Sequence, residues 1–406
     1  MSADNKVPEI RFEGFSGEWV ERSWSDTVYI STNMVDPRNC QYGELFHVGP
    51  GNIESFTGRF YNNVLKVKDS NLISGKFHFN KGDIIYGKIN PQLAKYVIAP
   101  FEGLASADAY VLNTQNGVVQ NYLFAILHTE HFYKYTVSVS SRTGMPKINR
   151  DELNIYNYMA PSESEQTQIG NYFQKLNALI NQHQQKHDKL SSIKKAMLEK
   201  MFPKPSETLP EIRFKGFSGE WEKKELGELA EIVRGASPRP IEDPKWFDSQ
   251  SSVGWLRIRD VTEQDGRIHY LEQRISKLGQ EKTRVLHEKH LLLSIAASVG
   301  KPVVNYVETG VHDGFLIFKK PLFELEFMYQ WLKSFETKWQ QFGQPGSQVN
   351  LNSDIVKNLI VTIPTNEEQT VIGNYFQKLD ALINQHQQQI TKINNIKQAC
   401  LSKMFV

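Results

Sequence analysis

One long segment occurs twice in this sequence. Residues 165–185 read EQTQIGNYFQKLNALINQHQQ, and residues 368–388 read EQTVIGNYFQKLDALINQHQQ, so 19 of 21 positions are identical. The copies lie 203 residues apart in a chain of 406 residues. A repeat of this length and spacing predicts a protein built from two halves on a common plan.

A second repeat opens each half. Residues 8–19 read PEIRFEGFSGEW and residues 210–221 read PEIRFKGFSGEW, with 11 of 12 positions identical. We call these segments tag 1 and tag 2. Each half is therefore a tag, a region of variable sequence and a long repeated segment. Two such large units favour a pseudo-two-fold molecule over a solenoid of many short repeats.

Composition is that of an ordinary globular protein. The chain is 40% hydrophobic and 23% charged, which excludes a disordered chain. Two cysteines, Cys40 and Cys400, exclude a disulfide framework and a cysteine-based zinc site and fit a reducing compartment. Since no apolar run resembles a signal peptide or a membrane span, we expect a cytoplasmic location. The net charge of +2 neither favours nor excludes nucleic acid, because a DNA-binding face needs local positive charge.

The variable regions predict a mixture of strands and helices. Short apolar runs broken by Gly, Pro and Asn indicate strands. These runs are Asp83–Tyr86, Tyr96–Ala99, Tyr110–Leu112, Trp255–Ile258, Leu291–Ile295, Val303–Val307 and Phe315–Phe318. Helices are predicted at Asn121–Tyr135 and Glu326–Phe342. We expect five segments: tag 1 with a mixed α/β domain at 1–158, a helix at 159–202, a linker with tag 2 at 203–221, a second α/β domain at 222–361 and a helix at 362–406.

The two variable regions become similar at two places. Residues 148–151 and 351–354 lie 203 residues apart, and each of these two segments is followed by an apolar strand and then a proline. Earlier, Asp83–Lys95 aligns with Lys289–Lys301 as strand, polar turn and lysine. The halves therefore share a scaffold and differ in the domain that each presents.

The long repeated segments predict helices of about 40 residues. Ser162 with Glu165, and Thr365 with Glu368, predict capping boxes at the helix starts. Apolar residues recur at heptad spacing, which is typical of a coiled-coil seam. Each helix has its twin as the obvious partner, and a pseudo-two-fold arrangement makes the pair antiparallel. The predicted seam residues are Ile169, Phe173, Leu176, Ile180, His183, Leu190, Ile372, Phe376, Leu379, Ile383, His386, Ile390 and Ile393.

Two seam positions are occupied by His183 and His386. Histidines at equivalent positions could be metal ligands or a pH switch. A polar register pair in a helical core is the simpler interpretation, because no cysteine or carboxylate cluster accompanies them.

The sequence lacks the motifs of common catalytic sites. We find no G-x-x-x-x-G-K-[ST], G-x-G-x-x-G, H-E-x-x-H or G-x-S-x-G pattern in a suitable context. Residues 90–93, NPQL, begin like the Asn-Pro-Pro-Tyr motif of amino-methyltransferases but lack its second proline and aromatic residue, so we interpret them as a turn. Asp83 and Lys88 could belong to a nuclease-like site, but a second acid is missing. We therefore expect a non-catalytic chain.

Polar and basic side chains grouped on turns are candidates for DNA reading, because Arg, Lys, Asn and Gln can bind base edges with paired hydrogen bonds. Exposed basic residues are also common on ordinary surfaces, so the groups carry more weight than any single member. The first domain offers Lys88, Asn90, Gln92, Lys95, Ser141, Arg142, Thr143 and Lys147. The second domain offers Arg234, Ser237, Arg239, Arg257, Arg259, Ser298, Lys301, Gln348 and Asn350.

Taken together, these residues resemble the specificity (S) subunits of type I restriction–modification systems, the HsdS family. The resemblance spans the full length. It depends on the duplicated order of tag, variable region and helix, and on the junctions PSESEQTQIGNYF and PTNEEQTVIGNYF. The segments WLRIRDV, LLLSIAASVGK and KGDIIYGKINPQLAK add to it.

The resemblance implies an α+β fold with two globular target recognition domains, joined by two long helices in an antiparallel coiled coil. Each domain would read one half of a split DNA target, and the helices would set the gap. The chain itself would have no catalytic activity and no cofactor. Two modification subunits, which carry S-adenosylmethionine and methylate adenine N6, would dock on the helices. Restriction subunits that use ATP and Mg would complete the complex.

If the seam faces the twin helix, the opposite face is free for a partner. That face carries Asn171, Gln174, Lys175, Gln182, Gln185, Asn374, Gln377, Lys378, Gln385 and Gln388. Two other interpretations stay open. One is a nuclease or methyltransferase site hidden in a variable domain, and the other is a DNA-binding or protein-binding scaffold outside restriction.

Overall fold

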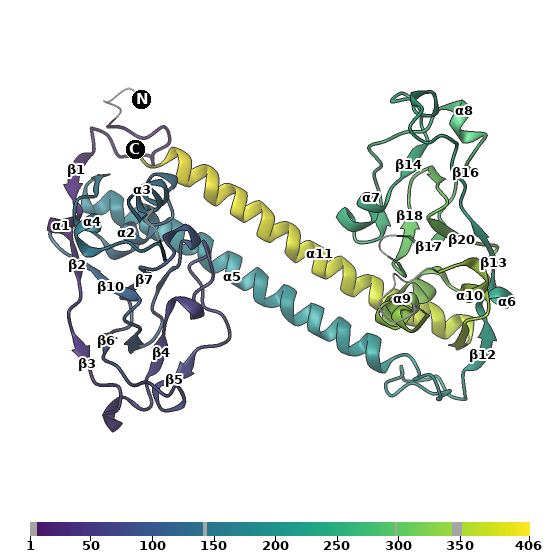
Figure 1. The fold of residues 1–406 in the computed structure, drawn as a ribbon, viewed down its shortest axis with the longest axis horizontal. Helices are drawn as coiled ribbons and strands as arrows, with labels where there is room; N and C mark the ends of the chain where they lie inside the picture. Colours follow the sequence, from purple (N-terminus) through teal and green to yellow (C-terminus); the bar gives the residue numbers. More distant parts are fainter. Residues whose placement is uncertain (1–5, 141–143, 297–298, 343–350) are drawn as a thin grey trace. The chain divides into compact units, whose positions relative to one another are not determined.

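The computed structural model of the chain describes residues 6–140, 144–296, 299–342 and 351–406. Two compact units divide the chain. Unit 1 comprises Met1–Gln185 and Gln387–Val406, and unit 2 comprises Lys186–His386. Each unit therefore contains one variable region together with parts of both long helices (Figure 1).

The two long helices are α5 (Glu163–Lys200) and α11 (Asn366–Lys403), each of 38 residues. Within unit 1 they are antiparallel. The Tyr172 hydroxyl lies 3.6 Å from the Cys400 thiol near one end, and Ile180 shares a core with Ile390 further along. As residue numbers rise along α5, those of its neighbours on α11 fall.

Unit 2 repeats this antiparallel pairing. Lys194 Nζ binds Asp380 Oδ1 at 2.5 Å, and the rings of Phe202 and Phe376 stack with centroids 6.0 Å apart. The prediction of antiparallel helices is therefore confirmed inside each unit. All predicted seam residues are buried or half-buried, as a helical seam requires.

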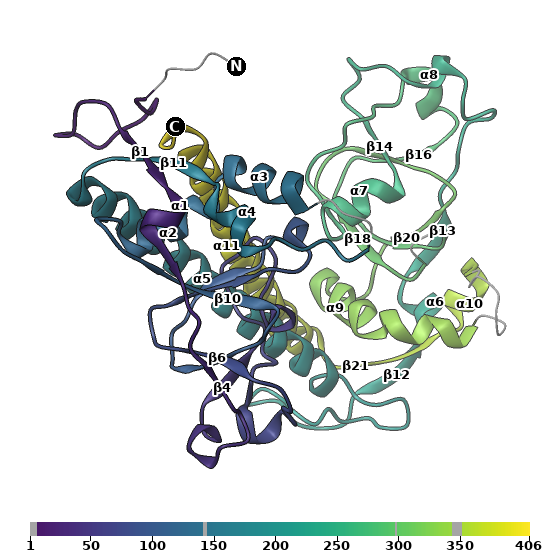
Figure 2. The same cartoon turned by 60° about the vertical axis from the view of Figure 1, so that its left-hand side comes forward.

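The variable region of unit 1 forms a four-stranded sheet, a five-stranded sheet and a two-stranded ladder. Its strands are β1 (Val20–Ser23), β2 (Val28–Ile30), β3 (Met34–Val35), β4 (Phe46–Val48), β5 (Leu65–Lys66), β6 (Lys76–Phe79), β7 (Ile84–Gly87), β8 (Tyr96–Ile98), β9 (Gly103–Ala105), β10 (Ala109–Thr114) and β11 (Asn157–Ala160). The sheet orders are β2-β10-β7-β8, β3-β6-β9-β4-β5 and β1-β11. Figure 2 shows β1 beside β11. The short helices are α1 (Trp24–Thr27), α2 (Gln120–Ile126), α3 (Glu130–Ser140) and α4 (Arg150–Asn154).

Unit 2 has a similar plan, but one of its larger sheets has a fifth strand and the other has three strands instead of five. Its strands are β12 (Glu222–Glu225), β13 (Glu231–Arg234), β14 (Gly254–Leu256), β15 (Arg267–Ile268), β16 (Arg284–Leu286), β17 (Leu291–Ser294), β18 (Pro302–Asn305), β19 (Thr309–Val311), β20 (Phe315–Lys319) and β21 (Ile360–Ile363). The sheet orders are β13-β20-β17-β18-β15, β14-β19-β16 and β12-β21. The helices are α6 (Leu226–Leu229), α7 (Ile258–Glu263), α8 (Lys277–Gln280), α9 (Leu325–Phe335) and α10 (Ser353–Lys357).

The strand–turn–lysine similarity between the variable regions is confirmed. β7 and β17 occupy the same place in the two sheets, because each is flanked by β10 or β20 on one side and by β8 or β18 on the other. Gly87 N donates to Lys95 O, and Ser294 N donates to Lys301 O. The turn in unit 2 is one residue shorter than the turn in unit 1. The sequence offset that aligns the two strands is therefore one residue larger than the offset that aligns the two lysines.

Three predictions of secondary structure were wrong in part. The helix expected over Asn121–Tyr135 is two helices, α2 and α3, because the chain turns between them, where Thr129 Oγ1 donates to the Ile126 carbonyl at 2.7 Å. The expected strand Trp255–Ile258 ends at Leu256, and α7 starts at Ile258. Beyond Phe335 the predicted helix continues as a 3-10 helix over Glu336–Phe342.

Each tag binds the start of one long helix and the end of the other. In unit 1 the Arg11 guanidinium donates to both carboxylate oxygens of Glu165 at 2.7 and 2.6 Å, and Ile10 N donates to Lys403 O at 3.0 Å. We call this contact of tag 1, the start of α5 and the end of α11 the first joint.

The second joint, in unit 2, uses the matching residues. Arg213 donates to both oxygens of Glu368 at 2.7 Å, and Ile212 N donates to Lys200 O at 2.9 Å. The capping-box prediction fails for Glu165 and Glu368, because both carboxylates bind a tag arginine instead of the helix backbone.

The next repeated residues fasten each variable region to its long helix. Gln166 Oε1 accepts from Val119 N at 3.0 Å, and Gln369 Oε1 accepts from Glu324 N at 2.9 Å. Val119 and Glu324 are the residues that precede α2 and α9. The glutamate and glutamine that the two copies of the helical repeat share therefore make matching contacts in both units.

Candidate nucleic-acid interface

In the first domain, the structure brings several of the predicted residues together on two adjoining loops. Asn90 N donates to Pro146 O at 2.7 Å, and Ile148 N donates to Lys88 O at 2.9 Å. These bonds tie the turn after β7 to the segment that carries Lys147, which is exposed. Asn90 adopts a left-handed conformation with φ of 50°, one that Asn tolerates better than most residues.

This pair of loops is basic. Lys88 Nζ lies over the Tyr110 ring at 5.5 Å from its centroid. Burial lowers the pKa of Lys88, and the nearby positive charges of Lys147 and Arg150 lower it further against the opposing effect of Asp108. Arg150 was missed in the sequence analysis. The positive charges of Lys147 and Arg150 beside Lys88 favour binding of an anion such as a DNA phosphate.

Other predicted members of the first group have different positions. Lys95 Nζ donates to Pro50 O at 2.6 Å, so its ammonium group holds a neighbouring loop. Gln92 is exposed. Ser141, Arg142 and Thr143 lie outside the described residues.

In the second domain, three predicted residues converge on Asp313, which the sequence analysis missed: two bind its carboxylate and one binds its backbone carbonyl. Ser237 Oγ donates to Asp313 Oδ1 at 2.7 Å, and Arg239 Nη2 donates to Asp313 Oδ2 at 2.6 Å. Arg234 Nε donates to the Asp313 carbonyl oxygen at 2.6 Å. Burial would raise the pKa of Asp313, but the hydrogen bond from Ser237 and the charge of Arg239 lower it.

Arg257 and Arg259 lie beside the same edge of the domain. β14 and β19 are parallel neighbours, so Arg257 after β14 and Asp313 after β19 emerge together. Arg257 binds Asp260 at 2.9 Å, and Arg259 binds Glu263 at 2.8 Å. Both also contact Glu272, at 3.2 and 3.3 Å. Reading a base with either arginine therefore requires exchange of a carboxylate for the base edge.

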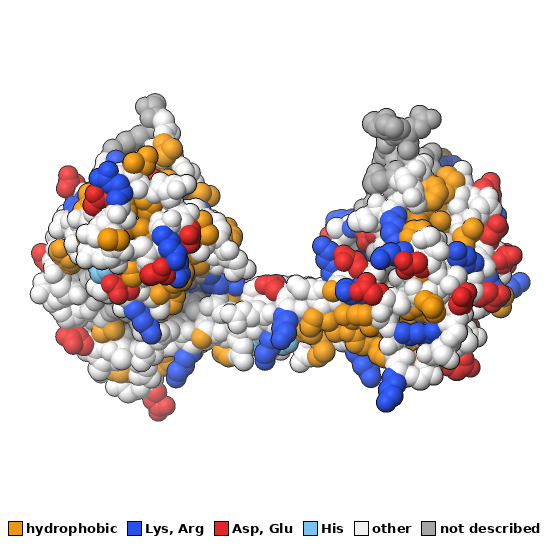
Figure 3. Space-filling model, turned by 90° about the horizontal axis from the view of Figure 1, so that it is seen from below, with side chains coloured by type: hydrophobic (Ala, Val, Ile, Leu, Met, Phe, Trp, Pro, Cys, Tyr) orange, Lys and Arg blue, Asp and Glu red, His pale blue; other side chains and the backbone are white. Residues whose placement is uncertain are grey.

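The remaining predicted residues of the second domain are near the turn after β17. Lys301 is half-buried at the start of the return strand, where its carbonyl accepts from Ser294. Ser298, Gln348 and Asn350 lie outside the described residues. In the face shown in Figure 3, basic and acidic side chains are interspersed over both units. This face therefore shows no continuous basic patch.

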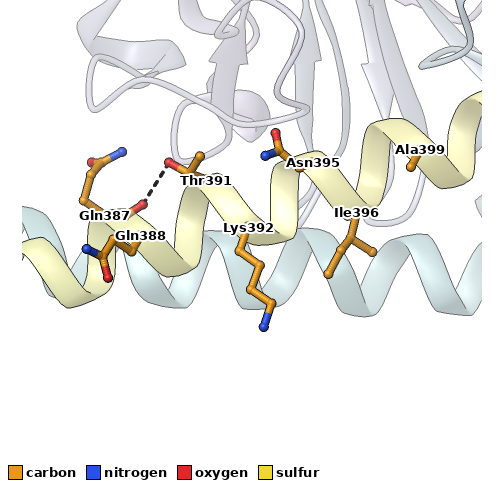
Figure 4. Close-up of a pocket in the computed structure, with 7 residues that line it drawn as sticks. All are labelled: Gln387, Gln388, Thr391, Lys392, Asn395, Ile396 and Ala399. Atoms are coloured by element: carbon orange, nitrogen blue, oxygen red, sulfur yellow. Dashed lines mark hydrogen bonds between the residues drawn. The ribbon is translucent and has the colours of Figure 1, made fainter. Parts of the chain in front are cut away.

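The outward residues predicted for the long helices are all exposed. Leu179 and Leu382, which are equivalent in the repeat, lie on the same helices with 44% and 43% of their surface exposed. A shallow hollow of about 610 Å³ lies further along α11. Lys392 and Ile396, which line it, point to the same side of the helix (Figure 4). Its lining residues are Gln387, Gln388, Thr391, Lys392, Asn395, Ile396 and Ala399.

Among residues with described positions, no three His, Cys, Asp or Glu side chains are grouped to hold a metal ion. His183 and His386 are half-buried and belong to different units. No helix within the described ranges is long and apolar enough to cross a membrane.

Comparison with known proteins places the chain in a family. The family of the type I restriction modification DNA specificity domain matches residues 46–192 and 218–395. Since these matches cover most of both halves, the chain belongs to this family.

Individual relatives agree with this assignment. The EcoDI specificity subunit of a type I restriction enzyme from Escherichia coli is 33% identical over 153 residues, which are 37% of this chain and 33% of that protein. The MjaVIII specificity subunit from Methanocaldococcus jannaschii is 22% identical over 80% of this chain and 76% of its own length. The chain thus matches only about a third of the E. coli protein.

Solved structures share the fold. The S subunit of a type I restriction–modification system from M. genitalium aligns over 98% of this chain and 99% of its own, with a TM-score of 0.63 and 13% identity. A chain from a study of complex assembly and conformational transition of the type I R-M system aligns over 95% and 97%, with a TM-score of 0.51 and 16% identity. The predicted α+β fold with two domains and two long helices is confirmed.

Proposed function

We propose that this chain is the specificity subunit of a type I restriction–modification complex and that each variable region reads one half of a two-part DNA target. The main support is the contrast within the repeat. The two joints use the same residues, whereas the side chains on the candidate reading loops differ: the first domain has the Lys88–Lys147 pair of loops, and the second has arginines and a serine gathered on Asp313. Two different readers on matched scaffolds suit an asymmetric target.

The chain in this proposal supplies recognition and no catalysis. Two modification subunits carry S-adenosylmethionine and methylate adenine N6, and restriction subunits use ATP and Mg. The repeated outward faces around Leu179 and Leu382 would dock the two copies of the modification subunit, since equivalent surfaces bind equivalent partners. An exposed leucine among polar residues has the composition of a small interface core with a polar rim.

Exchange of one reading domain tests the proposal. Replacing residues 20–158 with the matching region of another specificity subunit should change one half of the methylated sequence and leave the other half and the gap unchanged. The reason is that the joints are kept while one set of reading loops is replaced. Mapping methylated adenines in DNA from cells carrying the complete system measures this.

The unmodified chain serves as the control, and a chain with residues 222–361 exchanged should change only the opposite half. Loss of both halves in either chimera that still assembles would argue against independent reading. Methyl transfer by the purified chain alone would argue for a hidden catalytic site.

The gap length should depend on the long helices. Inserting one heptad into α5 near Gln185 and one into α11 near His386 should lengthen each helix by about 10 Å, roughly three base pairs of B-DNA rise. The mapped target should then have a longer gap with unchanged halves. An assembled variant that keeps its original gap would show that the helices do not set the spacing.

A further inference from the structure

Next to the joints, the two units differ in charge at one position of the helical repeat, Asn177 in unit 1 and Asp380 in unit 2. In unit 2, Asp380 accepts from Lys194 at 2.5 Å, from Arg267 at 3.1 Å and from Gln330 at 2.9 Å. The side chains of Lys194, Arg267 and Asp380 are only 14–15% exposed. Arg267 also binds Glu326 at 2.8 Å, so Asp380 is the carboxylate that pairs with Lys194 in a buried cluster linking α5, β15, α9 and α11.

Unit 1 has the lysine without the carboxylate. Lys397 is the counterpart of Lys194, and Asn177 occupies the position of Asp380, in both cases 203 residues away. Lys397 is 5% exposed, and it has no hydrogen bond or ion pair with any residue whose position is described. The sequence contains no Asp or Glu after Asp380, so α11 cannot supply a partner within this unit.

The groups that face Lys397 add positive charge or none. Arg59 contributes a positive charge and is itself bound to Glu54 at 2.8 Å. Burial lowers the pKa of His128, and the nearby positive charge of Lys397 lowers it further. The buried Nε2 of His128 has no hydrogen-bond partner among the described residues. Burial, reinforced by Arg59, lowers the pKa of Lys397 to about 8.

We propose that the Asn177/Asp380 difference makes the joints unequal, so that the end of α11 in the first joint opens more readily than the end of α5 in the second. A buried ammonium without a counter-charge opposes closure, whereas the three donors around Asp380 favour it. Opening exposes Lys397 to water and restores its ordinary pKa.

The sign of the pH dependence follows from this shift. Between about pH 8 and pH 10.5 the open first joint binds more protons than the closed one. Raising the pH through this window therefore stabilises the closed first joint. Below about pH 8 Lys397 is charged in both states, so the full free-energy cost of burying its charge opposes closure.

Hydrogen exchange of the full-length chain tests the proposal with matched segments, residues 390–403 of α11 and 187–200 of α5. After correction for intrinsic rates, the α11 segment should exchange roughly tenfold faster or more at pH 7, the factor that corresponds to one pKa unit. The Asn177→Asp variant should slow α11 exchange by a similar factor at a given pH and remove its extra pH dependence. The reciprocal Asp380→Asn variant should speed exchange in the α5 segment.

A second variant keeps the proposal testable if Asn177→Asp does not fold. Lys397→Met keeps the length of the side chain, removes its charge, and should also slow exchange in the α11 segment at pH 7. Equal protection of the two segments in the unmodified chain would overturn the proposal. So would an unchanged α11 rate in Asn177→Asp, whatever Lys397→Met does, because position 177 would then not be the cause.

Discussion

Replacing Glu368 with alanine is expected to lower the free energy of unfolding of unit 2 by about 3 kcal/mol, the lower end of the range for breaking a buried ion pair. The Glu368 side chain is 1% exposed and that of Arg213 is 18% exposed. Without the carboxylate, Arg213 stays in the joint with only the backbone carbonyls of Ser218 and Gly219 as acceptors. Urea denaturation followed by tryptophan fluorescence measures the loss.

Two controls separate this pair from general surface electrostatics. Glu44→Ala removes a carboxylate that is 69% exposed and binds Lys66 and Lys68, and no measurable change is expected because water screens such pairs. The double variant Arg213→Met with Glu368→Leu should be less destabilised than Glu368→Ala, since no buried charge is left unpaired. A loss for Glu44→Ala as large as that for Glu368→Ala would contradict this account.

Replacing Gly170 with valine is expected to destabilise unit 1 by about 2–3 kcal/mol, as overpacking of a close contact does. A Cβ at Gly170 would lie 2.7 Å from Asn121 Cβ and 2.9 Å from the backbone nitrogen of Tyr122. Backbone atoms cannot move aside as a side chain can, so the first turn of α2 must shift away from α5. That shift would also disturb the packing of Tyr122 against Trp19, and thermal unfolding would report it.

The neighbouring position provides the matched control. Asn171→Val introduces the same side chain at an exposed site of the same helix, where only the small cost of a β-branched residue in a helix applies. If both variants lose the same stability, the close crossing of α5 and α2 does not explain the glycine. Gly373 is its counterpart in unit 2, with the Phe327 backbone nitrogen 3.0 Å from an added Cβ.

Much of the secondary structure was predictable because its signals are local. Buried strands such as β17 and β20 appear as apolar runs, and α5 and α11 appear as heptads. The break between α2 and α3 was not predictable, because no Gly or Pro marks residues 127–129. The packing of Phe132 in α3 against Trp24 joins residues far apart in the chain and is not visible in the local sequence.

The candidate site was predictable in residue type but not in pairing. Lys88, Asn90 and Lys147 do come together across the adjoining loops. By contrast, a sequence cannot tell that Arg257 and Arg259 share Glu272, or that Asp313 gathers Ser237 and Arg239. These partners are far apart along the chain, so only the fold brings them within hydrogen-bond distance.

The sequence by itself determined that the protein is duplicated, that its helices pair through heptad seams and that two different domains are presented, since repeats and periodicity are properties of the chain. It also held an unused signal, because the tag arginine and the helix glutamate are both identical between the halves. Only the tertiary structure decided that these residues bind each other, with Arg11 joined to Glu165 and Arg213 to Glu368. It likewise decided that one joint has its buried lysine neutralised while the other does not. The physical reason is that the energy of a buried charge depends on which groups surround it in space, and the order of residues along the chain does not give this.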